Sequence, residues 1–468
     1  MNNDWGLVSQ FFFLSILLCV ALIVKTKFHL FRKHLVPLAL IAGILGLILG
    51  PEVLKIIPFD NHALTSFVYH SMSIGFIAIA LKDRDTKKKK NKDALKTGLL
   101  IVNAYVIQGI LGLGLSLFLA AFFFPSLFPA SGMILPLGFG QGAAQAFSIG
   151  QSWENTMGFV NGGNFGLTIA AIGMLWAIIG GVPYMNYLVK KYKGQSMKQI
   201  REQNKDFANL ESLDPDNAEK TSDVPHGFHI DEMAMQLVMI GIVYAITYVF
   251  MSVLNTLLAP LGSLGATLAG TIWGFSFIWA TLFALALRAL LDLLFKKNVV
   301  KVKYVDNFLM QKISSSIFEF MIVASIAAIS FTQLKDNWIP ILIITTAGGI
   351  LTMLYTTYAC KRVYKEHWVE YMVMNYGVWT GIVSNGMALL REVDPKAETP
   401  VPENFVLGSG IAAIIGVPLL FVVALPAFAV KYNNPIWYAI TFVALIVYFA
   451  VLTLCLVHIR KGEKKRGE

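Results

Sequence analysis

The stretch "ILPLGFGQGAAQAFSIG", residues 134–150, is apolar but is a poor candidate for an ordinary membrane helix. It lies within residues 97–153, which carry no charged side chain, yet it is rich in glycine and contains Gln141 and Gln145. Glycine in a helix interior is less favourable than alanine by roughly 0.5–1 kcal/mol. An unpaired peptide group in the hydrocarbon core of a membrane is also costly. Such a segment is tolerated only where protein encloses it or where it lines a water-filled cavity.

The composition predicts an all-α polytopic membrane protein. The chain has 468 residues, of which 56% are hydrophobic and 14% are charged, and its mean hydropathy is +0.64. A span needs about 20 apolar residues. The sequence predicts about eleven transmembrane helices, at residues 5–25, 35–50, 66–82, 97–124, 163–189, 233–257, 262–293, 313–331, 338–360, 404–430 and 435–458.

The basic residues predict the orientation of these spans. Most of the 38 lysines and arginines fall in alternate connections, namely 25–34, 82–96, 190–231, 296–312, 361–367 and the tail after residue 459. The opposite connections hold only Lys55, Lys335 and Lys431. Positive charge stays on the cytoplasmic side, so we expect the amino terminus outside and the carboxyl terminus in the cytoplasm. The basic residues behind the net charge of +10 thus serve to orient the spans in the membrane, and a nucleic-acid partner is excluded.

Two halves of the chain resemble each other faintly. Residues 163–172, "GNFGLTIAAI", and residues 405–414, "FVLGSGIAAI", share the pattern Gly-x-x-Ile-Ala-Ala-Ile, and residues 66–80 correspond to residues 316–330. Five spans in each half, an odd number, predict repeats of inverted topology. The predicted organisation is a first repeat at 1–189, a polar cytoplasmic linker at 190–231, a second repeat at 232–431, and an additional helix with a basic tail at 432–468.

Two glycine-bearing segments, residues 133–153 and 368–392, are left over. If the first crossed the membrane once, the basic loop that follows residue 189 would move outside, against the charge rule. Both segments are therefore predicted to be re-entrant hairpins, which enter and leave on the same side. Their tips are expected to meet near the midplane and to leave backbone N–H and C=O groups free to bind ions.

At this point the sequence resembles a known family. The matching features are Gly138-Phe139-Gly140-Gln141-Gly142 followed by Ala143 and Ala144, then Trp153-Glu154, then Asn164-Phe165-Gly166-Leu167-Thr168. Across residues 5–430 the chain resembles the sodium/glutamate symporters, which are similar to the sodium-dependent 2-hydroxycarboxylate transporters. The resemblance implies inverted repeats with re-entrant hairpins, sodium-coupled uptake of an acidic amino acid, elevator-like movement and a homodimer in the plasma membrane of a bacterium. The second hairpin departs from the family, because Gly377 and Gly381 supply only two glycines of a Gly-x-Gly-x-Gly core.

Candidate binding residues follow from the chemistry of the cargo. An acidic solute needs positive potential, which helix N-termini supply, and sodium needs oxygen ligands. The solute-binding candidates are Gly140, Gln141, Gly142, Gln145, Gly377, Thr380, Gly381 and Arg391. The sodium-binding candidates are Ser148, Asn161, Asn164, Thr168, Asn375, Ser384, Asn385 and Ser409.

Each candidate has a structural alternative. The glycines could serve close helix packing, and the hydroxyls could bond to their own helix. Arg391 could be a cytoplasmic loop residue paired with Glu392. His70 and Glu319 lie at near-equivalent places in the two halves, which indicates either a shared depth or two water-exposed helix ends.

The main functional prediction is sodium-coupled import of L-glutamate or a similar acidic solute, with Na⁺ as coupling ion and no cofactor. The partners are thus a small anionic solute, Na⁺ and lipid. One alternative keeps the scaffold but carries a dicarboxylate, a hydroxycarboxylate or another amino acid. A second alternative is an ion channel, although the sequence shows no set of charged residues that would form a selectivity ring. A membrane enzyme is a third, although the hydrophobic segments contain no paired-carboxylate, His/Cys metal or nucleophile motif.

Overall fold

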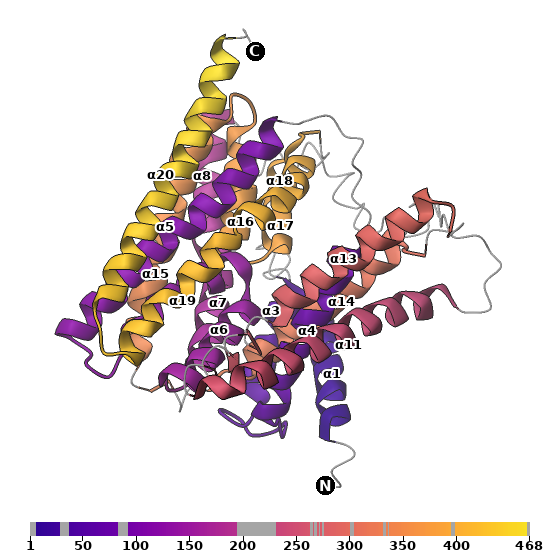
Figure 1. Ribbon diagram of the computed structural model, residues 1–468. Helices are drawn as coiled ribbons and strands as arrows, with labels where there is room; N and C mark the ends of the chain where they lie inside the picture. The colour runs from indigo at the N-terminus through magenta and orange to yellow at the C-terminus, as the bar shows by residue number, and fades with distance from the viewer. Residues whose placement is uncertain are drawn as a thin grey trace. The chain divides into compact units, whose positions relative to one another are not determined.

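A computed structural model gives the arrangement of the helices (Figure 1). The part of the chain that it describes comprises residues 6–28, 37–82, 92–193, 231–262, 265, 269–270, 272–273, 276–299, 304–330, 334–335, 337–394 and 398–465. Over these residues the secondary structure is helical, with turns and short connections and no strand. The all-α prediction is confirmed for this part of the protein. Most of the predicted linker, residues 194–230, lies outside it.

The described residues contain nine helices that are long and apolar enough to cross a membrane. Eight of these spans centre on α1 (Gly6–Lys27), α4 (Asn61–Leu81), α5 (Lys92–Phe122), α11 (Glu232–Leu258), α13 (Ser276–Lys296), α14 (Asn307–Ala327), α15 (Trp338–Val363) and α20 (Ile436–Lys465). The ninth runs from Gly162 to Tyr192 and contains α7 (Gly162–Ile179) and most of α8 (Gly181–Lys193).

Two of the eleven predicted spans look different in the structure. Residues 35–50 become α3 (Leu38–Leu49), whose 12 residues give about 18 Å of helix, short of the hydrocarbon thickness. Residues 404–430 become α18 (Val401–Ile415) and α19 (Val417–Lys431), which bend by 51° at Gly416. The described residues therefore give nine candidate spans, or up to ten if the bent pair counts as one.

Helices α4 and α14, which overlap the two segments that the sequence predicted to correspond, begin in the same way. Both α4 and α14 have 21 residues, and each follows an aspartate in extended conformation. The carboxylate of Asp60 accepts from the backbone N–H of His62, and that of Asp306 accepts from the N–H of Leu309. An aspartate at this position satisfies one of the free N–H groups of the first turn. Both helices thus begin with an aspartate cap.

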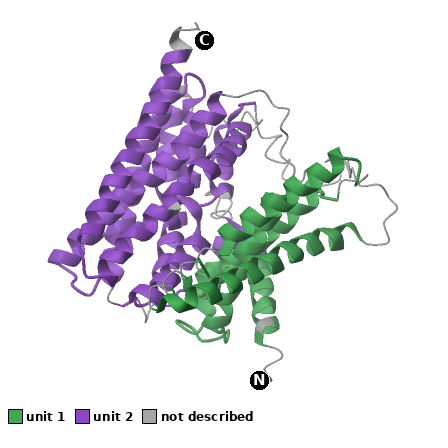
Figure 2. Ribbon diagram, viewed as in Figure 1, with its two compact units in different colours: residues 1–20, 42–87, 212–328 green, residues 21–41, 88–211, 329–468 purple. Residues whose placement is uncertain are grey.

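The chain divides into two compact units, coloured separately in Figure 2. Unit 1 comprises residues 1–20, 42–87 and 212–328. It contains α4, α11, α13 and α14, which pack around a core that includes Ile77, Met239, Val243, Ala280 and Met310.

Unit 2 comprises residues 21–41, 88–211 and 329–468. Its long helix α5 contacts α15, α18 and α20. The sequence predicted a boundary between residues 1–189 and 232–431. By compactness, α5 is grouped with α15 and α20, and α4 is grouped with α14, so each unit takes helices from both predicted repeats.

Candidate solute and ion site

The first glycine-rich segment is interrupted at Gly142. A short 3-10 turn, η2 (Ser131–Ile134), leads to a π-helical turn, η3 (Leu137–Gln141), in which the N–H of Gly142 donates to the carbonyl of Leu137 at 2.9 Å. Gly142 has φ 98° and ψ 173°, a conformation that favours glycine, and α6 (Ala143–Met157) starts directly after it. Since Gly142 has no side chain, the first N–H groups of α6 receive no side-chain cap.

The second segment has a similar interruption. Helix α16 (Trp368–Trp379) ends before Thr380, Ile382 is extended, and α17 (Val383–Val393) begins without a side-chain cap. A methyl group on Gly377 would lie 2.7 Å from Cα of Gly386, so α16 and α17 pack closely as a helical hairpin. Gly377 thus lies inside α16, where its lack of a side chain permits this close packing. We call residues 137–142 the first break and residues 379–382 the second break.

The two breaks lie next to each other within unit 2. Apart from the chain neighbours of Gly142, Ile382 is the only described residue within 4 Å of the place that a side chain on Gly142 would occupy. Gly173 of α7 packs against both breaks, since a methyl group there would lie 2.5 Å from the carbonyl of Thr380 and 2.7 Å from the ring of Phe139. The start of α6 and the start of α17 are therefore brought close together.

Helix α5 is bonded to both breaks. The hydroxyl of Tyr105 donates to the carbonyl of Gly140 at 2.7 Å, and Nε2 of Gln108 donates to the carbonyl of Trp379 at 2.9 Å and to Oγ1 of Thr352 at 2.8 Å. Residues three apart share a helix face, and these two lie near the middle of α5. Sequence reasoning missed both residues, although each is a polar group in an apolar span.

Several buried polar atoms near the breaks have no hydrogen-bond partner among the described residues. They are Oε1 of Gln108, Oε1 of Gln145, Oγ of Ser148, Oδ1 of Asn375, Nε1 of Trp379, and Oδ1 and Nδ2 of Asn385. All six side chains are at most 7% exposed. A buried polar group without a partner costs stability, so these atoms are suited to a bound ion or solute.

No charged side chain occurs within residues 97–153 or 371–390, which supply both breaks. The positive potential at the breaks comes from the N-termini of α6 and α17, because unpaired N–H groups gather there. Such ends bind anions, and amide, hydroxyl and carbonyl oxygens bind sodium. The arrangement can hold an anionic group and a small cation together without a fixed charge.

The remaining predicted residues are placed as follows. Thr168 and Ser409 donate their hydroxyl protons to backbone carbonyls of their own helices, at Asn164 and Phe405. The side-chain oxygen of Asn164 accepts from the N–H of Ser330 at 3.3 Å. Asn161 has φ 56° and precedes the first turn of α7. Gln141 ends the π-helical turn and is half-buried. The hydroxyl of Thr380 donates to the carbonyl of Tyr376 in the preceding turn. The side chain of Ser384 lies outside the described part.

Arg391 is not brought together with the breaks. It is exposed in the last turn of α17, nine residues after Ile382, which corresponds to about 13 Å along a helix. This placement favours the alternative of a residue at the water-exposed end of the hairpin. In unit 1, His70 and Glu319 are both exposed, and Nδ1 of His70 is hydrogen-bonded to the hydroxyl of Tyr244.

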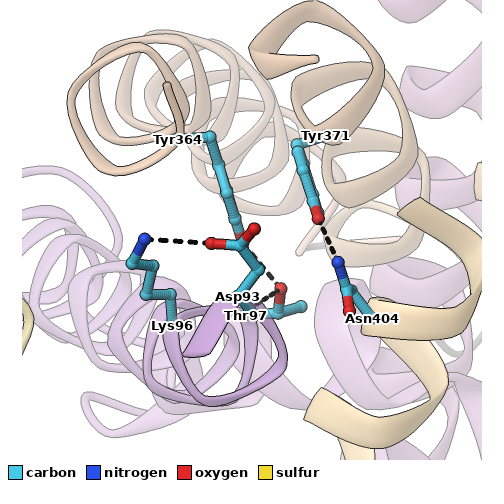
Figure 3. Close-up of polar contacts among 6 residues, drawn as sticks. All are labelled: Asp93, Lys96, Thr97, Tyr364, Tyr371 and Asn404. Carbon is cyan, nitrogen blue, oxygen red and sulfur yellow. Dashed lines mark hydrogen bonds and ion pairs between the residues drawn. The ribbon is translucent and has the colours of Figure 1, made fainter. Parts of the chain in front are cut away.

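A polar cluster occupies the beginning of α5 (Figure 3). It lies before Tyr105 and Gln108, the residues of α5 that are bonded to the breaks. Lys96, only 3% exposed, pairs with Asp93 at 2.9 Å, and the hydroxyls of Thr97 and Tyr364 lie 2.7 Å apart. Nδ2 of Asn404 donates to the hydroxyl of Tyr371, whose ring stacks on that of Tyr364. Burial raises the pKa of Tyr364 well above its ordinary value. The cluster ties the start of α16 to α5 and α18.

A comparison with protein-family models identifies the class of protein. A model described as sodium/glutamate symporter matches residues 6–377. The chain belongs to the sodium/glutamate symporter family. A search of curated proteins found no match.

Membership of the sodium/glutamate symporter family indicates sodium-coupled transport and Na⁺ as coupling ion, and it assigns the chain to transporters. The nine apolar helices fit a multi-pass membrane protein of this kind. The matched region includes the first break, α5 and α15, and it ends at Gly377 inside α16. The second break and α17 lie beyond it, so in this symporter their assignment rests on the geometry above.

Proposed function

We propose that the protein is a sodium-coupled secondary transporter that imports L-glutamate or a similar acidic solute. The solute's carboxylates would bind the free N–H groups at the starts of α6 and α17, and Na⁺ would bind oxygens at the two breaks. The observation that carries the proposal is the meeting of two uncapped helix N-termini in buried, uncharged surroundings that also hold unpartnered amide and hydroxyl groups.

Membrane energetics explain why sodium is needed. Carrying one net negative charge into an inside-negative cell costs about 2.3 kcal/mol per 100 mV. One Na⁺ per glutamate cancels this charge, and a second makes the cycle favoured by the potential. No lysine or arginine lies within residues 97–153 or 371–390, so neither segment supplies a cation of its own, and in the proposal Na⁺ or the solute provides it.

The proposed topology has the amino terminus outside, the carboxyl terminus in the cytoplasm, and hairpins that enter from opposite sides. It is supported by the basic connections, by the matched caps of α4 and α14, and by the position of Tyr105 and Gln108 near the middle of α5. Both breaks and the helices that hold them belong to unit 2, which supports elevator-type movement of that unit as one body. A homodimer in a bacterial plasma membrane rests on the family resemblance alone.

Uptake of radiolabelled L-glutamate into proteoliposomes tests the function. We expect accumulation under an inward NaCl gradient and none under an equal choline chloride gradient, and sodium-independent uptake would refute coupling. Competition by unlabelled dicarboxylates, hydroxycarboxylates and other amino acids identifies the solute class.

Two variants test the site itself. Gln141→Ala and Asn385→Ala should lose uptake while remaining monodisperse in detergent, because each removes a polar group at one break. Wild-type uptake by both would remove these residues from the site.

A further inference from the structure

The side-chain amide of Gln108 has only one possible orientation. One neighbour, the carbonyl of Trp379, can only accept a hydrogen bond. The other, the hydroxyl of Thr352, gives its own proton to the carbonyl of Gly348 at 2.7 Å and so also accepts from Gln108. Two accepting neighbours require the NH₂ group on that side. Both amide protons are therefore used.

The same two bonds fix the oxygen of this amide. Gln108 is fully buried, and its Oε1 has no hydrogen-bond partner among the described residues. The amide lies against Trp379, the first residue of the second break. Since the group is planar and held at its nitrogen, Oε1 is a rigid acceptor next to that break.

Position distinguishes Gln108 from a similar residue on the same helix. Asn103 is also buried, its Nδ2 donates to Oγ1 of Thr453 on α20 at 3.0 Å, and its Oδ1 is also without a partner. Asn103, however, faces α20, whereas Gln108 faces the second break. An unpartnered oxygen alone would not single out Gln108, but one held against a break does.

We infer that Oε1 of Gln108 binds a monovalent cationic group in the solute and ion site, either Na⁺ or the ammonium group of an amino-acid solute. A neutral, rigid oxygen in surroundings without acidic side chains is a ligand for such a group. The inference rests on the proposed function and adds to it a residue of α5. Gln108 would thus bind the cation and position the second break at the same time.

The test uses Gln108→Met, which keeps the length of the side chain and removes the whole amide, both Oε1 and the two bonds of Nε2. The first arm measures thermal stabilisation of the purified full-length protein by NaCl, against choline chloride and without solute. If the group is Na⁺, the NaCl concentration for half-maximal stabilisation should rise at least tenfold. The second arm compares inhibition of labelled glutamate uptake by L-glutamate and by glutarate, which lacks the ammonium group. If the group is the ammonium, the preference for L-glutamate should fall about tenfold while the sodium response is kept.

Two controls and one substitute for the test variant make the result decisive. Asn103→Leu removes a comparable buried amide and should change neither arm. Thr352→Val removes one of the two acceptors that hold the amide nitrogen but keeps Oε1 of Gln108. In whichever measurement Gln108→Met changes, Thr352→Val should therefore cause a smaller change. If Gln108→Met does not fold, Gln108→Asn withdraws the oxygen by one carbon and should give the same shift.

Unchanged values in both arms, with a folded variant, would overturn the inference. So would equal effects of Gln108→Met and Thr352→Val, since Gln108 would then only hold the break. Failure of the wild-type protein to respond to sodium would instead refute the proposed function, so the two failures are distinguishable.

Discussion

Tyr105 of α5 and Gly140 of the first break are in direct contact. The hydroxyl of Tyr105 donates to the carbonyl of Gly140, and a methyl group on Gly140 would lie 2.1 Å from Cε1 of the tyrosine ring. The ring therefore occupies the space of the missing side chain. This contact places the π-helical turn against the middle of a membrane-spanning helix.

Gly140→Ala should damage the site by displacing Tyr105. Overpacking of this kind costs about 1–3 kcal/mol, so we expect a lower melting temperature and loss of most sodium-driven uptake. Gly114→Ala is the matched control, because the nearest described atom to its methyl group would be 3.9 Å away. Normal uptake by Gly140→Ala would contradict the contact.

Tyr105→Phe keeps the ring and removes only the hydrogen bond to Gly140. The bond contributes about 1 kcal/mol, and its loss leaves a buried carbonyl unpaired. We expect a severalfold decrease in the uptake rate with little change in the yield of folded protein. Tyr448→Phe also removes a hydroxyl bonded to a backbone carbonyl, that of Ile415, and should leave uptake unchanged. Equal rates for the two variants would argue against a special role of Tyr105.

Gly381→Ala should displace Asn385 from the second break. A methyl group on Gly381 would lie 2.4 Å from Nδ2 of Asn385, whose amide has no partner among the described residues to hold it. Since misplacement of a binding group by about 1 Å can cost two orders of magnitude in rate, we expect at least a tenfold loss of uptake. Gly410→Ala, with no described atom within 4 Å, should behave like the wild type. An unaffected Gly381→Ala would place Asn385 outside the site.

Asp93→Asn should destabilise the polar cluster at the start of α5. The change removes the carboxylate that pairs with the buried Lys96, but the side chain of Asp93 is 42% exposed, so the cost is about 1–2 kcal/mol. Lys96→Met should cost less, because methionine keeps the packing of the stem and Asp93 remains in contact with water. Thermal unfolding in detergent measures both. A more harmful Lys96→Met would show that the lysine charge is needed for another reason.

Much of the fold could be predicted because its determinants are local. Apolar segments of spanning length predicted where the membrane helices lie, and each of the eleven predicted segments overlaps a helix or a helix pair. Glycines and glutamines in a charge-free segment predicted the first break, and the structure interrupts the helix at Gly142. Segment ends were less accurate, because α3 is short and α18 and α19 bend at Gly416.

Hydropathy, glycine content and motif are properties of neighbouring residues, so the sequence was enough to predict a helical membrane protein of the sodium/glutamate symporter family. The packing of the helices was needed to show which groups lie near the breaks. It placed Tyr105 and Gln108 against the breaks and left Arg391 at the far end of α17. The physical reason is that contacts between Gln108 and Trp379, 271 residues apart, depend on how whole helices pack, and no local pattern encodes that packing.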